Sequence, residues 1–378
     1  MSRIAIVGPV HPLRGGIAQH TTGILREARS RNHDVRVLSY RRQYPDILFP
    51  GRTQLDPGAA PPETSHGVSS PIDSLAPWTW YRAAAEAAAF EPDLVLLQRW
   101  HPFFAPPLAV IARRLRGRAR VAWMVHNARP HEDGVPWGPL LRFGLHDGDL
   151  CLVHAEAEAE ALRALGVRAG VRRVPMPTPS EVSRVDASEA RARLGFSQGE
   201  IVFLFFGHVR RYKGVEVLLE ALARLPADGP PWRAVLAGEW YVDRGPSDAL
   251  ISKAGLGDRV RIDDRFVAAA EVDEYFGAAT IAVLPYVSGT QSAVVPLAYA
   301  YGRPVVTTRV GGLAEAVVEG ETGRLVAPGD VDALAAALED VRNGQCFSAE
   351  AIGRAHGAAS FSGLVDELEA IVHAPVFP

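Results

Sequence analysis

Short apolar runs rich in valine, isoleucine and leucine alternate along this chain with longer segments of helical periodicity. Several runs are apolar throughout, which is typical of parallel strands covered on both faces. Repeated strand–helix alternation predicts α/β units with parallel sheets. The predicted strands lie at residues 4–8, 35–40, 94–98, 120–126 and 150–154, and then at 201–207, 233–239, 281–286, 304–310 and 324–328. Helices are expected at 17–31, 80–90, 215–225 and 331–342.

The alternation breaks at PMPTPSEVSRVDAS, residues 175–188. Its prolines, serines and charges sustain neither periodicity, so we interpret it as an interdomain linker. IAIVGPVHPLRGG near the start and IVFLFFGHVRRYKG after the linker share a scheme of strand, glycine, basic loop and helix. A chain of 378 residues is long enough for two domains. The sequence therefore predicts two doubly wound, Rossmann-like α/β domains in tandem, with a long loop at 44–77.

Composition is that of a globular protein, with 48% hydrophobic and 22% charged residues. No run of about 18 apolar residues occurs, so no membrane span is expected. The apolar stretch near the N-terminus is only a few residues long and is interpreted as a first strand, not as a signal peptide. Cys151 and Cys346 are too few for a disulfide framework and lack metal-ligand spacing, which predicts a reducing, cytoplasmic location.

Charge is distributed unevenly along the chain. Residues 1–178 contain 22 arginines, no lysine and 16 acidic residues, whereas residues 179–378 contain 18 basic and 27 acidic residues. The formal charge is therefore +6 in the first part and −9 in the second. This split supports two domains with different surfaces. Two explanations of the basic first part are equally good. One is chance surface composition, and the other is a first domain that faces an anionic partner, such as the inner membrane surface.

Ligands of open parallel sheets bind where strands end, beside helix N-termini. The first predicted strand is followed by Gly8 and then by Gly15 and Gly16, which come directly before a helix. A glycine pair there lets backbone N–H groups approach an anion closely, although a plain tight turn is an equal alternative. The spacing is not GxGxxG, and no acidic residue closes the strand at 35–40. Both facts argue against a dinucleotide cofactor.

The strand at 201–207 ends in a strongly basic loop, GHVRRYKG, at residues 207–214. Its three cations, among them Arg210 and Lys213, repel one another unless an anion binds there. Lys213 is one of two lysines in the chain, against 38 arginines. A diphosphate is the natural ligand, because an arginine can form bidentate hydrogen bonds to two oxygens while a lysine supplies a compact charge. The alternative is a solvated basic turn.

The strand at 281–286 leads into YVSGTQSAVVPLA, residues 286–298. We expect a helix to open at its small hydroxylated residues, so that the N–H groups of Thr290, Gln291 and Ser292 hold phosphate oxygens. Ordinary helix capping is the alternative. The phosphate interpretation is favoured because this segment follows a strand of the same predicted sheet as the basic loop.

Polar side chains also follow the strand at 120–126. His126 and Asn127 close it, and Arg129, His131 and Glu132 come next. Their density at a strand end in a basic domain favours a substrate site over a structural role. The sequence contains no metal-binding, Walker, GxSxG or nucleic-acid-binding motif, so no metal, cofactor or nucleic acid is expected.

Together these features resemble the nucleotide-sugar-dependent glycosyltransferases of family 4, which have the two-Rossmann-domain architecture called GT-B. The resemblance covers most of the chain. It is carried by VGPVHPLRGGIAQH, MVHNARPHE, FFGHVRRYKGVEVLLEAL and VLPYVSGTQSAVVPLAYAYGRPVVTTRVGGLAEAVVEGETGRLVAPGD. The last stretch is the most specific, because it combines Ala-x-Gly-x-Pro-Val-Val, Gly-Gly-x-x-Glu and Gly-x-Leu-Val-x-Pro-x-Asp.

The resemblance implies that residues 1–178 bind an acceptor, that residues 179–355 bind a nucleoside diphosphate sugar, and that catalysis takes place in a cleft between the two sheets. Residues 356–378 are expected to form a helical tail that packs back on the first domain. The acceptor is expected to be a small molecule, a glycan or a lipid-linked molecule. The resemblance further implies retention of anomeric configuration, without a metal or other cofactor.

Roles for individual residues follow from the family pattern. His126 corresponds to a histidine that contacts the transferred sugar, while Arg210 and Lys213 correspond to cations that neutralise the diphosphate. These three are the predicted catalytic residues. The predicted donor site also contains Gly15, Gly16, Gly207, Thr290, Gln291, Ser292 and Glu315, and the acceptor-side candidates are Asn127, Arg129 and His131.

The chain departs from the family at two positions. Family members usually carry two glutamates eight positions apart, the first near the donor sugar and the second on the ribose. Gly289 and Leu297 occupy those positions here. Recognition of the donor sugar is therefore expected to rest on residues 290–292 and on backbone groups.

Three functions are consistent with this sequence. We expect a retaining glycosyltransferase, in which Arg210 and Lys213 stabilise the negative charge that grows on the β-phosphate of the leaving group. A nucleotide-sugar 2-epimerase on the same fold is an alternative that needs no acceptor. A non-catalytic relative that binds nucleotide sugars is the other alternative, and the loss of the paired glutamates motivates it.

Overall fold

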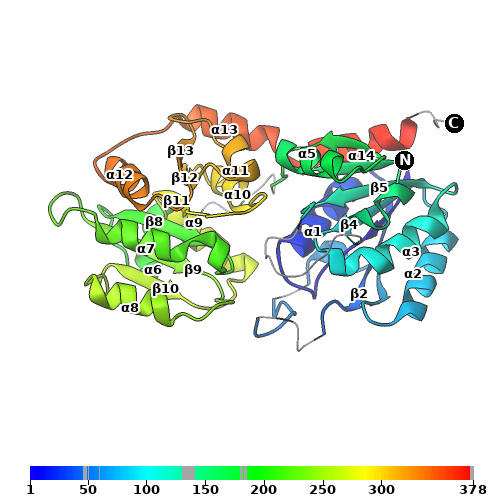
Figure 1. The fold of residues 1–378 in the computed structure, drawn as a ribbon, viewed down its shortest axis with the longest axis horizontal. Helices are drawn as coiled ribbons and strands as arrows, with labels where there is room; N and C mark the ends of the chain where they lie inside the picture. Colours follow the sequence, from blue (N-terminus) through cyan, green and yellow to red (C-terminus); the bar gives the residue numbers. More distant parts are fainter. Residues whose placement is uncertain are drawn as a thin grey trace. The chain divides into compact units, whose positions relative to one another are not determined.

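The protein is described by a computed structural model that covers residues 1–45, 49, 51–58, 60–129, 140, 142–178, 182 and 185–374. The chain divides into two compact units. Unit 1 contains Met1–Pro177 together with Ser360–Pro378, and unit 2 contains Thr178–Ala359. Each unit is built on a parallel sheet with helices between the strands, which confirms the predicted class of two Rossmann-like α/β domains (Figure 1).

Unit 1 contains a seven-stranded sheet in the order β3-β2-β1-β4-β5-β6-β7, and neighbouring strands are parallel. The strands are β1 (Arg3–Val7), β2 (Asp34–Arg42), β3 (Val68–Asp73), β4 (Leu94–Arg99), β5 (Arg120–Val125), β6 (Leu150–Val153) and β7 (Gly170–Arg173). The central strand β4 is buried along its whole length, which explains its uninterrupted apolar run. The strand order reverses between β1 and β4, and open α/β sheets bind ligands at the carboxyl ends of such strands.

Helices connect the strands of unit 1 and cover its sheet. They are α1 (Gly16–Ser30), α2 (Pro77–Ala89), α3 (Ala105–Leu115), α5 (Glu156–Ala164) and α14 (Phe361–His373), with 3-10 turns at Pro62–Thr64, Pro102–Phe104 and Leu145–Asp147. Within the described ranges, no helix combines the length and apolar character needed to cross a bilayer.

The C-terminal helix α14 is part of the core of unit 1 (Figure 1). Its buried face consists of Phe361, Leu364, Val365, Leu368 and Ile371, which pack with apolar residues of α1 and of strands β1, β2 and β4. At Gly23 of α1, a Cβ would lie 2.1 Å from the Phe361 ring, so only glycine permits this close contact. Arg31 at the end of α1 pairs with Asp366 of α14 (2.5 Å).

Unit 2 contains a six-stranded sheet in the order β10-β9-β8-β11-β12-β13, again with parallel neighbours. Its strands are β8 (Ile201–Phe206), β9 (Trp232–Ala237), β10 (Val260–Asp263), β11 (Ile281–Leu284), β12 (Val305–Thr308) and β13 (Gly323–Val326). Its helices are α6 (Ala187–Leu194), α7 (Val215–Ala223), α8 (Gly245–Lys253), α9 (Ala269–Ala278), α10 (Val294–Ala300), α11 (Gly311–Glu315), α12 (Val331–Arg342) and α13 (Ala349–Ala358). Here the order reverses between β8 and β11.

Three strands, β3, β7 and β10, were not predicted, and the long loop expected at 44–77 is wrong where β3 and the turn Pro62–Thr64 form. All three strands lie at sheet edges, where one side of the backbone is unpaired. Edge strands tolerate polar residues and proline, and VSSPID, GVRR and VRID therefore lack an apolar run. The boundary between the two units, at Pro177, lies inside the expected linker 175–188. Unit 2 ends at Ala359, whereas the second domain was expected to end at residue 355.

Candidate functional site

The basic loop of unit 2 leaves β8 where the strand order reverses. Gly207 adopts a φ of 101°, which favours glycine. Val209 donates its N–H to the carbonyl of Glu239, and Tyr241 donates its N–H to the carbonyl of Val209, both at 2.9 Å. The loop thus continues the β8–β9 pairing beyond the strands, and Arg211–Lys213 then form one 3-10 turn before α7. Backbone pairing therefore fixes the positions from which its cations project.

The side chains of this loop point to different surroundings. His208 stacks on Tyr241 with ring centroids 4.7 Å apart, and the guanidinium carbon of Arg210 lies 5.0 Å from the centroid of the same ring. Lys213 instead places its Nζ 5.5 Å from the ring centroid of Tyr286, which follows β11. Tyr241 and Tyr286 were not among the predicted site residues, although Tyr286 is the last residue of the predicted strand 281–286 and Tyr241 lies two residues after the predicted strand 233–239.

Lys213 is buried, with 9% of its surface exposed. A Cβ at Gly207 would lie 3.2 Å from its Nζ, so the glycine leaves room for the ammonium group. Burial lowers the pKa of Lys213 below its ordinary value, and the neighbouring Arg210 lowers that pKa further. No carboxylate in the part of the chain that the structure describes lies within 4.0 Å of this Nζ. A buried ammonium without a counter-ion is unfavourable, and the arrangement favours an anionic ligand.

The segment after β11 is held against the basic loop. Val287 donates its N–H to the carbonyl of Tyr212 at 2.8 Å. Gly214 adopts a φ of 67°, and a Cβ there would lie 2.1 Å from the carbonyl oxygen of Pro285. Glycine at 214 is therefore required for the ends of β8 and β11 to approach each other. The structure brings together the two loops that the sequence assigned to one phosphate site.

The expected helix start at Thr290–Ser292 is wrong, because α10 begins at Val294. The Ser292 hydroxyl accepts the N–H of Val294 and lies 3.2 Å from the Tyr286 hydroxyl. This local side-chain bond competes with helical hydrogen bonding and delays the helix. The Thr290 carbonyl accepts the N–H of Gly312 at 2.6 Å, so hydrogen bonds hold the segment 290–292 at both of its ends.

The remaining donor-site candidates of unit 2 lie in contrasting positions. Gly289 has a φ of 147°, and a Cβ there would make only ordinary contacts with Tyr286 and Tyr212. Leu297, the second family glutamate position, is half-buried against an apolar cluster of unit 2. Glu315 is the exposed last residue of α11. At the two positions where family members carry glutamates, Gly289 thus permits a positive φ and Leu297 contributes to apolar packing.

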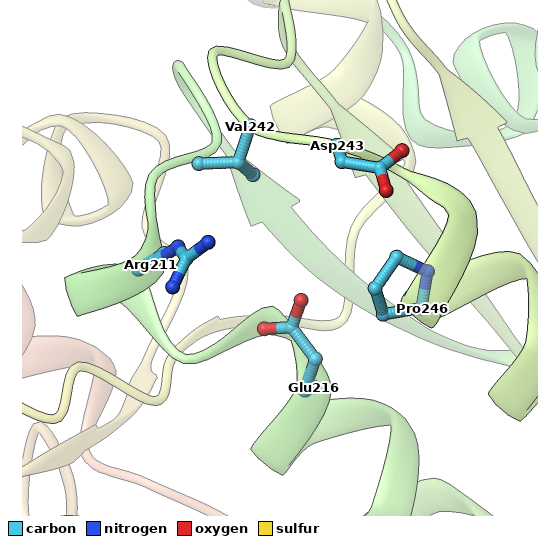
Figure 2. A pocket seen from close by; sticks show the side chains of 5 residues that line it. All are labelled: Arg211, Glu216, Val242, Asp243 and Pro246. Atoms are coloured by element: carbon cyan, nitrogen blue, oxygen red, sulfur yellow. The ribbon is translucent and has the colours of Figure 1, made fainter.

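Arg211 lines a cavity of about 370 Å³ in unit 2. Figure 2 shows its guanidinium and the carboxylate of Glu216 pointing into this space, which Val242, Asp243 and Pro246 complete. Lys213 lies against the Tyr286 ring. The two cations of this 3-10 turn, Arg211 and Lys213, therefore lie in different surroundings.

In unit 1, Gly15 is the N-cap of α1 with a φ of 111°. No atom lies within 4 Å of a Cβ built on Gly15 or Gly16, so their surroundings are open on that side. Asn127 donates from its side-chain amide to the carbonyl of Trp100 at 3.1 Å. Arg129 is exposed, and His131 lies outside the described residues.

His126 follows β5 and is buried, with 3% of its surface exposed. Its Nε2 lies 2.6 Å from the side-chain oxygen of Gln98 in β4. Burial, and then the neighbouring His154, lower the pKa of His126 well below 6.5, so the ring is neutral at pH 7. Gln98 and Glu239 were missed from the sequence. Each is a polar residue that closes an apolar run, and each is fully buried.

Among the residues with described positions, no group of three or more histidine, cysteine, aspartate or glutamate side chains is arranged to hold a metal ion.

Two family models match this chain. The model described as "Glycosyl transferase 4-like domain" matches residues 15–177, and the model described as "Glycosyl transferases group 1" matches residues 200–343. A D-inositol 3-phosphate glycosyltransferase from Nocardiopsis dassonvillei is 31% identical over 286 residues, which are 70% of this chain and 66% of that protein. D-inositol 3-phosphate glycosyltransferase 1 from Catenulispora acidiphila is 34% identical over 203 residues, 50% of this chain and 48% of that protein. The chain thus matches about half of the length of the latter relative.

Solved structures share the fold over nearly the whole chain. HepE from Anabaena in complex with UDP-glucose has a TM-score of 0.72 at 19% identity, covering 98% of this chain and 100% of that one. Sucrose-phosphate synthase from Thermosynechococcus elongatus has a TM-score of 0.69 at 21% identity, covering 98% and 96%. Fold and family models together define a glycosyltransferase of the GT-B class. The chain belongs to glycosyltransferase family 4.

Proposed function

We propose that this protein is a retaining, metal-independent glycosyltransferase that moves a sugar from a nucleoside diphosphate sugar to an acceptor hydroxyl. The observation that carries the proposal is Lys213, a buried ammonium without a carboxylate partner among the described residues, at the carboxyl end of β8. The names of the relatives and the UDP-glucose complex of HepE support a nucleotide-sugar donor.

The proposed reaction breaks the bond between the anomeric carbon and the β-phosphate oxygen and forms a bond from that carbon to the acceptor oxygen. Arg210 and Lys213 stabilise the charge that develops on the leaving diphosphate, which is the largest single contribution in many enzymes. A phosphate oxygen on the same face takes the acceptor proton, so the configuration is retained. These cations perform the charge neutralisation for which other enzymes use a metal.

The other proposed contacts follow the predicted site. A neutral His126 hydrogen-bonds the transferred sugar, and Asn127, Arg129 and His131 face the acceptor. The donor is held by Gly15, Gly16, Gly207, Thr290, Gln291, Ser292 and Glu315. The relatives are named for inositol 3-phosphate, and the excess of arginine in residues 1–178 supports an acceptor that also carries an anionic group.

A thermal-shift screen with UDP-, GDP- and ADP-sugars tests the donor. A ligand at about 100 times its Kd stabilises the native state by about 2.7 kcal/mol, so one donor class is expected to raise Tm by several degrees. Transfer to inositol phosphates and other polyol phosphates is then measured with that donor. Isomerisation of the donor without an acceptor would show the 2-epimerase, and tight binding without turnover would show the non-catalytic relative.

We also propose that unit 1 visits an anionic membrane from the cytoplasm. Leu75, which lies just before α2, and Trp78 and Tyr81 in its first turns are spaced three residues apart and are 49%, 67% and 64% exposed. Arg82 on the same helix is exposed. Tryptophan and tyrosine favour the bilayer interface, and each nearby arginine contributes about 1 kcal/mol at an anionic surface.

Trp78→Ala is expected to weaken binding to phosphatidylglycerol vesicles about tenfold or more in a sedimentation assay, with turnover on a soluble acceptor unchanged. Trp80→Phe is the matched control, because Trp80 is half-buried and its Nε1 donates to the carbonyl of Asp73. Equal binding of both variants would contradict the membrane proposal, as would Trp78-dependent self-association without vesicles.

A further inference from the structure

Four neighbouring strands of unit 1 end in a single buried cluster. Gly8 follows β1, Gln98 is in β4, His126 follows β5 and His154 follows β6, while His20 projects from α1. The ring centroids of the three histidines lie 4.8–5.4 Å apart. Gln98 is fully buried, and His20, His126 and His154 are between 3% and 6% exposed. The cluster lies at the carboxyl edge of the sheet, where the strand order reverses.

Gln98 links two of these histidines. Its side-chain oxygen lies 2.6 Å from Nε2 of His126, and its side-chain nitrogen lies 3.4 Å from Nδ1 of His20. An amide oxygen only accepts and an amide nitrogen only donates. His126 therefore carries its proton on Nε2, while His20 accepts at Nδ1. In a neutral imidazole this leaves Nδ1 of His126 as the acceptor.

Gly8 makes room for this amide. A Cβ at Gly8 would lie 2.6 Å from Cγ and 2.9 Å from Cβ of Gln98. Real Cβ atoms do not approach so closely, so any other residue at position 8 would displace the Gln98 side chain. β1 and β4 are paired from Ile4–Leu94 to Val7–Leu97, which fixes the two backbones that bring Gly8 and Gln98 together.

We infer that Gln98 is a positioning residue, seated by Gly8, which holds His126 as the Nε2–H tautomer and so presents Nδ1 as a hydrogen-bond acceptor for a sugar hydroxyl. The part concerning the sugar rests on the proposed function, whereas the tautomer does not. His154 donates from Nδ1 to the carbonyl of Val174 (3.0 Å), so its protonation is set independently of Gln98.

Nitrogen-15 NMR of the histidine rings in the full-length protein tests the tautomer directly. In the wild type, His126 is expected to show a protonated Nε2 and an unprotonated Nδ1. Gln98→Met removes both hydrogen bonds at similar volume and is expected to give a mixture of tautomers, and Gly8→Ala is expected to do the same with Gln98 still present. Gln98→Glu keeps an acceptor for Nε2–H and should retain the tautomer. His154 serves as the internal control.

Turnover with the donor found above provides the second readout. Gln98→Met is expected to lower kcat about 10- to 100-fold, by analogy with the residues that orient metal-ligating histidines, and Gln98→Glu is expected to lose less. A wild-type His126 protonated on Nδ1, or a tautomer unchanged in folded Gln98→Met, would overturn the inference. Lack of transfer by the wild type would overturn the proposed function instead, and the NMR result would still decide the role of Gln98. Thermal unfolding confirms that each variant is folded.

Discussion

Lys213→Ala is expected to lower kcat by a factor of about 10²–10³ while the protein stays folded. The reason is the position of its ammonium group, which is buried at the end of β8, beside Gly207 and against the Tyr286 ring. Such a group is already in place when charge develops on a leaving diphosphate and needs no reorganisation. Its effect is therefore expected in kcat, with a smaller effect on donor KM.

The same substitution is expected to raise the stability of the unliganded protein. Burial of an unpaired charge costs free energy, and removal of Lys213 relieves this cost. Lys213→Met, which keeps the volume of the side chain, should show the gain in Tm most clearly. Gain of stability with loss of activity is the pattern expected of a residue retained for function.

The matched control is Lys253→Ala, because Lys253 is the other lysine of the chain and is exposed at the end of α8. It should change neither kcat nor Tm. Steady-state kinetics and thermal unfolding of the three variants give both readouts. Near-normal turnover of Lys213→Ala would refute its role, and a fall in Tm would show that the ammonium has a structural partner.

The position of the basic loop at the end of β8 was predictable because its signals are local. A strand, a glycine and three cations followed by a helix occupy residues 201–214 without a gap, and parallel topology places the end of β11 beside them. The start of α10 was not predictable in the same way. A Ser292 side-chain bond to the backbone at Val294 outweighs the tendency of small hydroxylated residues to open a helix.

The histidine cluster of unit 1 illustrates what periodicity does not reveal. His20, His126 and His154 come from one helix and two strand ends. They meet because β5 and β6 are neighbours in the sheet and because α1 brings His20 against both rings. No sequence spacing between them indicates this contact. Gln98 looked like the last residue of an apolar strand, and its importance depends on the close approach of Gly8.

Acidification is expected to unfold unit 1 between about pH 6 and pH 4. Burial is the largest cause that lowers the pKa of His20, His126 and His154 below 6.5, and it brings the pKa of His154 to about 4. In the unfolded chain these rings titrate near 6.5. Below pH 6.5 the unfolded state therefore binds protons that the native state does not bind, and the free energy of unfolding falls as the pH falls.

The expected slope follows from the number of rings. Each contributes about 1.4 kcal/mol per pH unit, so three contribute about 4 kcal/mol per unit until the native rings begin to titrate. Since the whole stability of many domains is only about 5–15 kcal/mol, a loss at this rate is large enough to unfold the unit. Carboxylates whose native pKa is lowered, such as that of Asp73, add to the loss only at lower pH.

Urea unfolding followed by hydrogen exchange, at pH 7.5, 6.5, 5.5 and 5.0, resolves unit 1 from unit 2 and measures this slope. His20→Gln should flatten it by about one third, because one of three buried rings no longer titrates. His66→Gln is the control, since His66 is exposed and lies outside the histidine cluster. A free energy of unfolding of unit 1 that stays constant from pH 7.5 to 5.0 would contradict a neutral, buried cluster. It would mean that water or a counter-charge reaches these rings in solution.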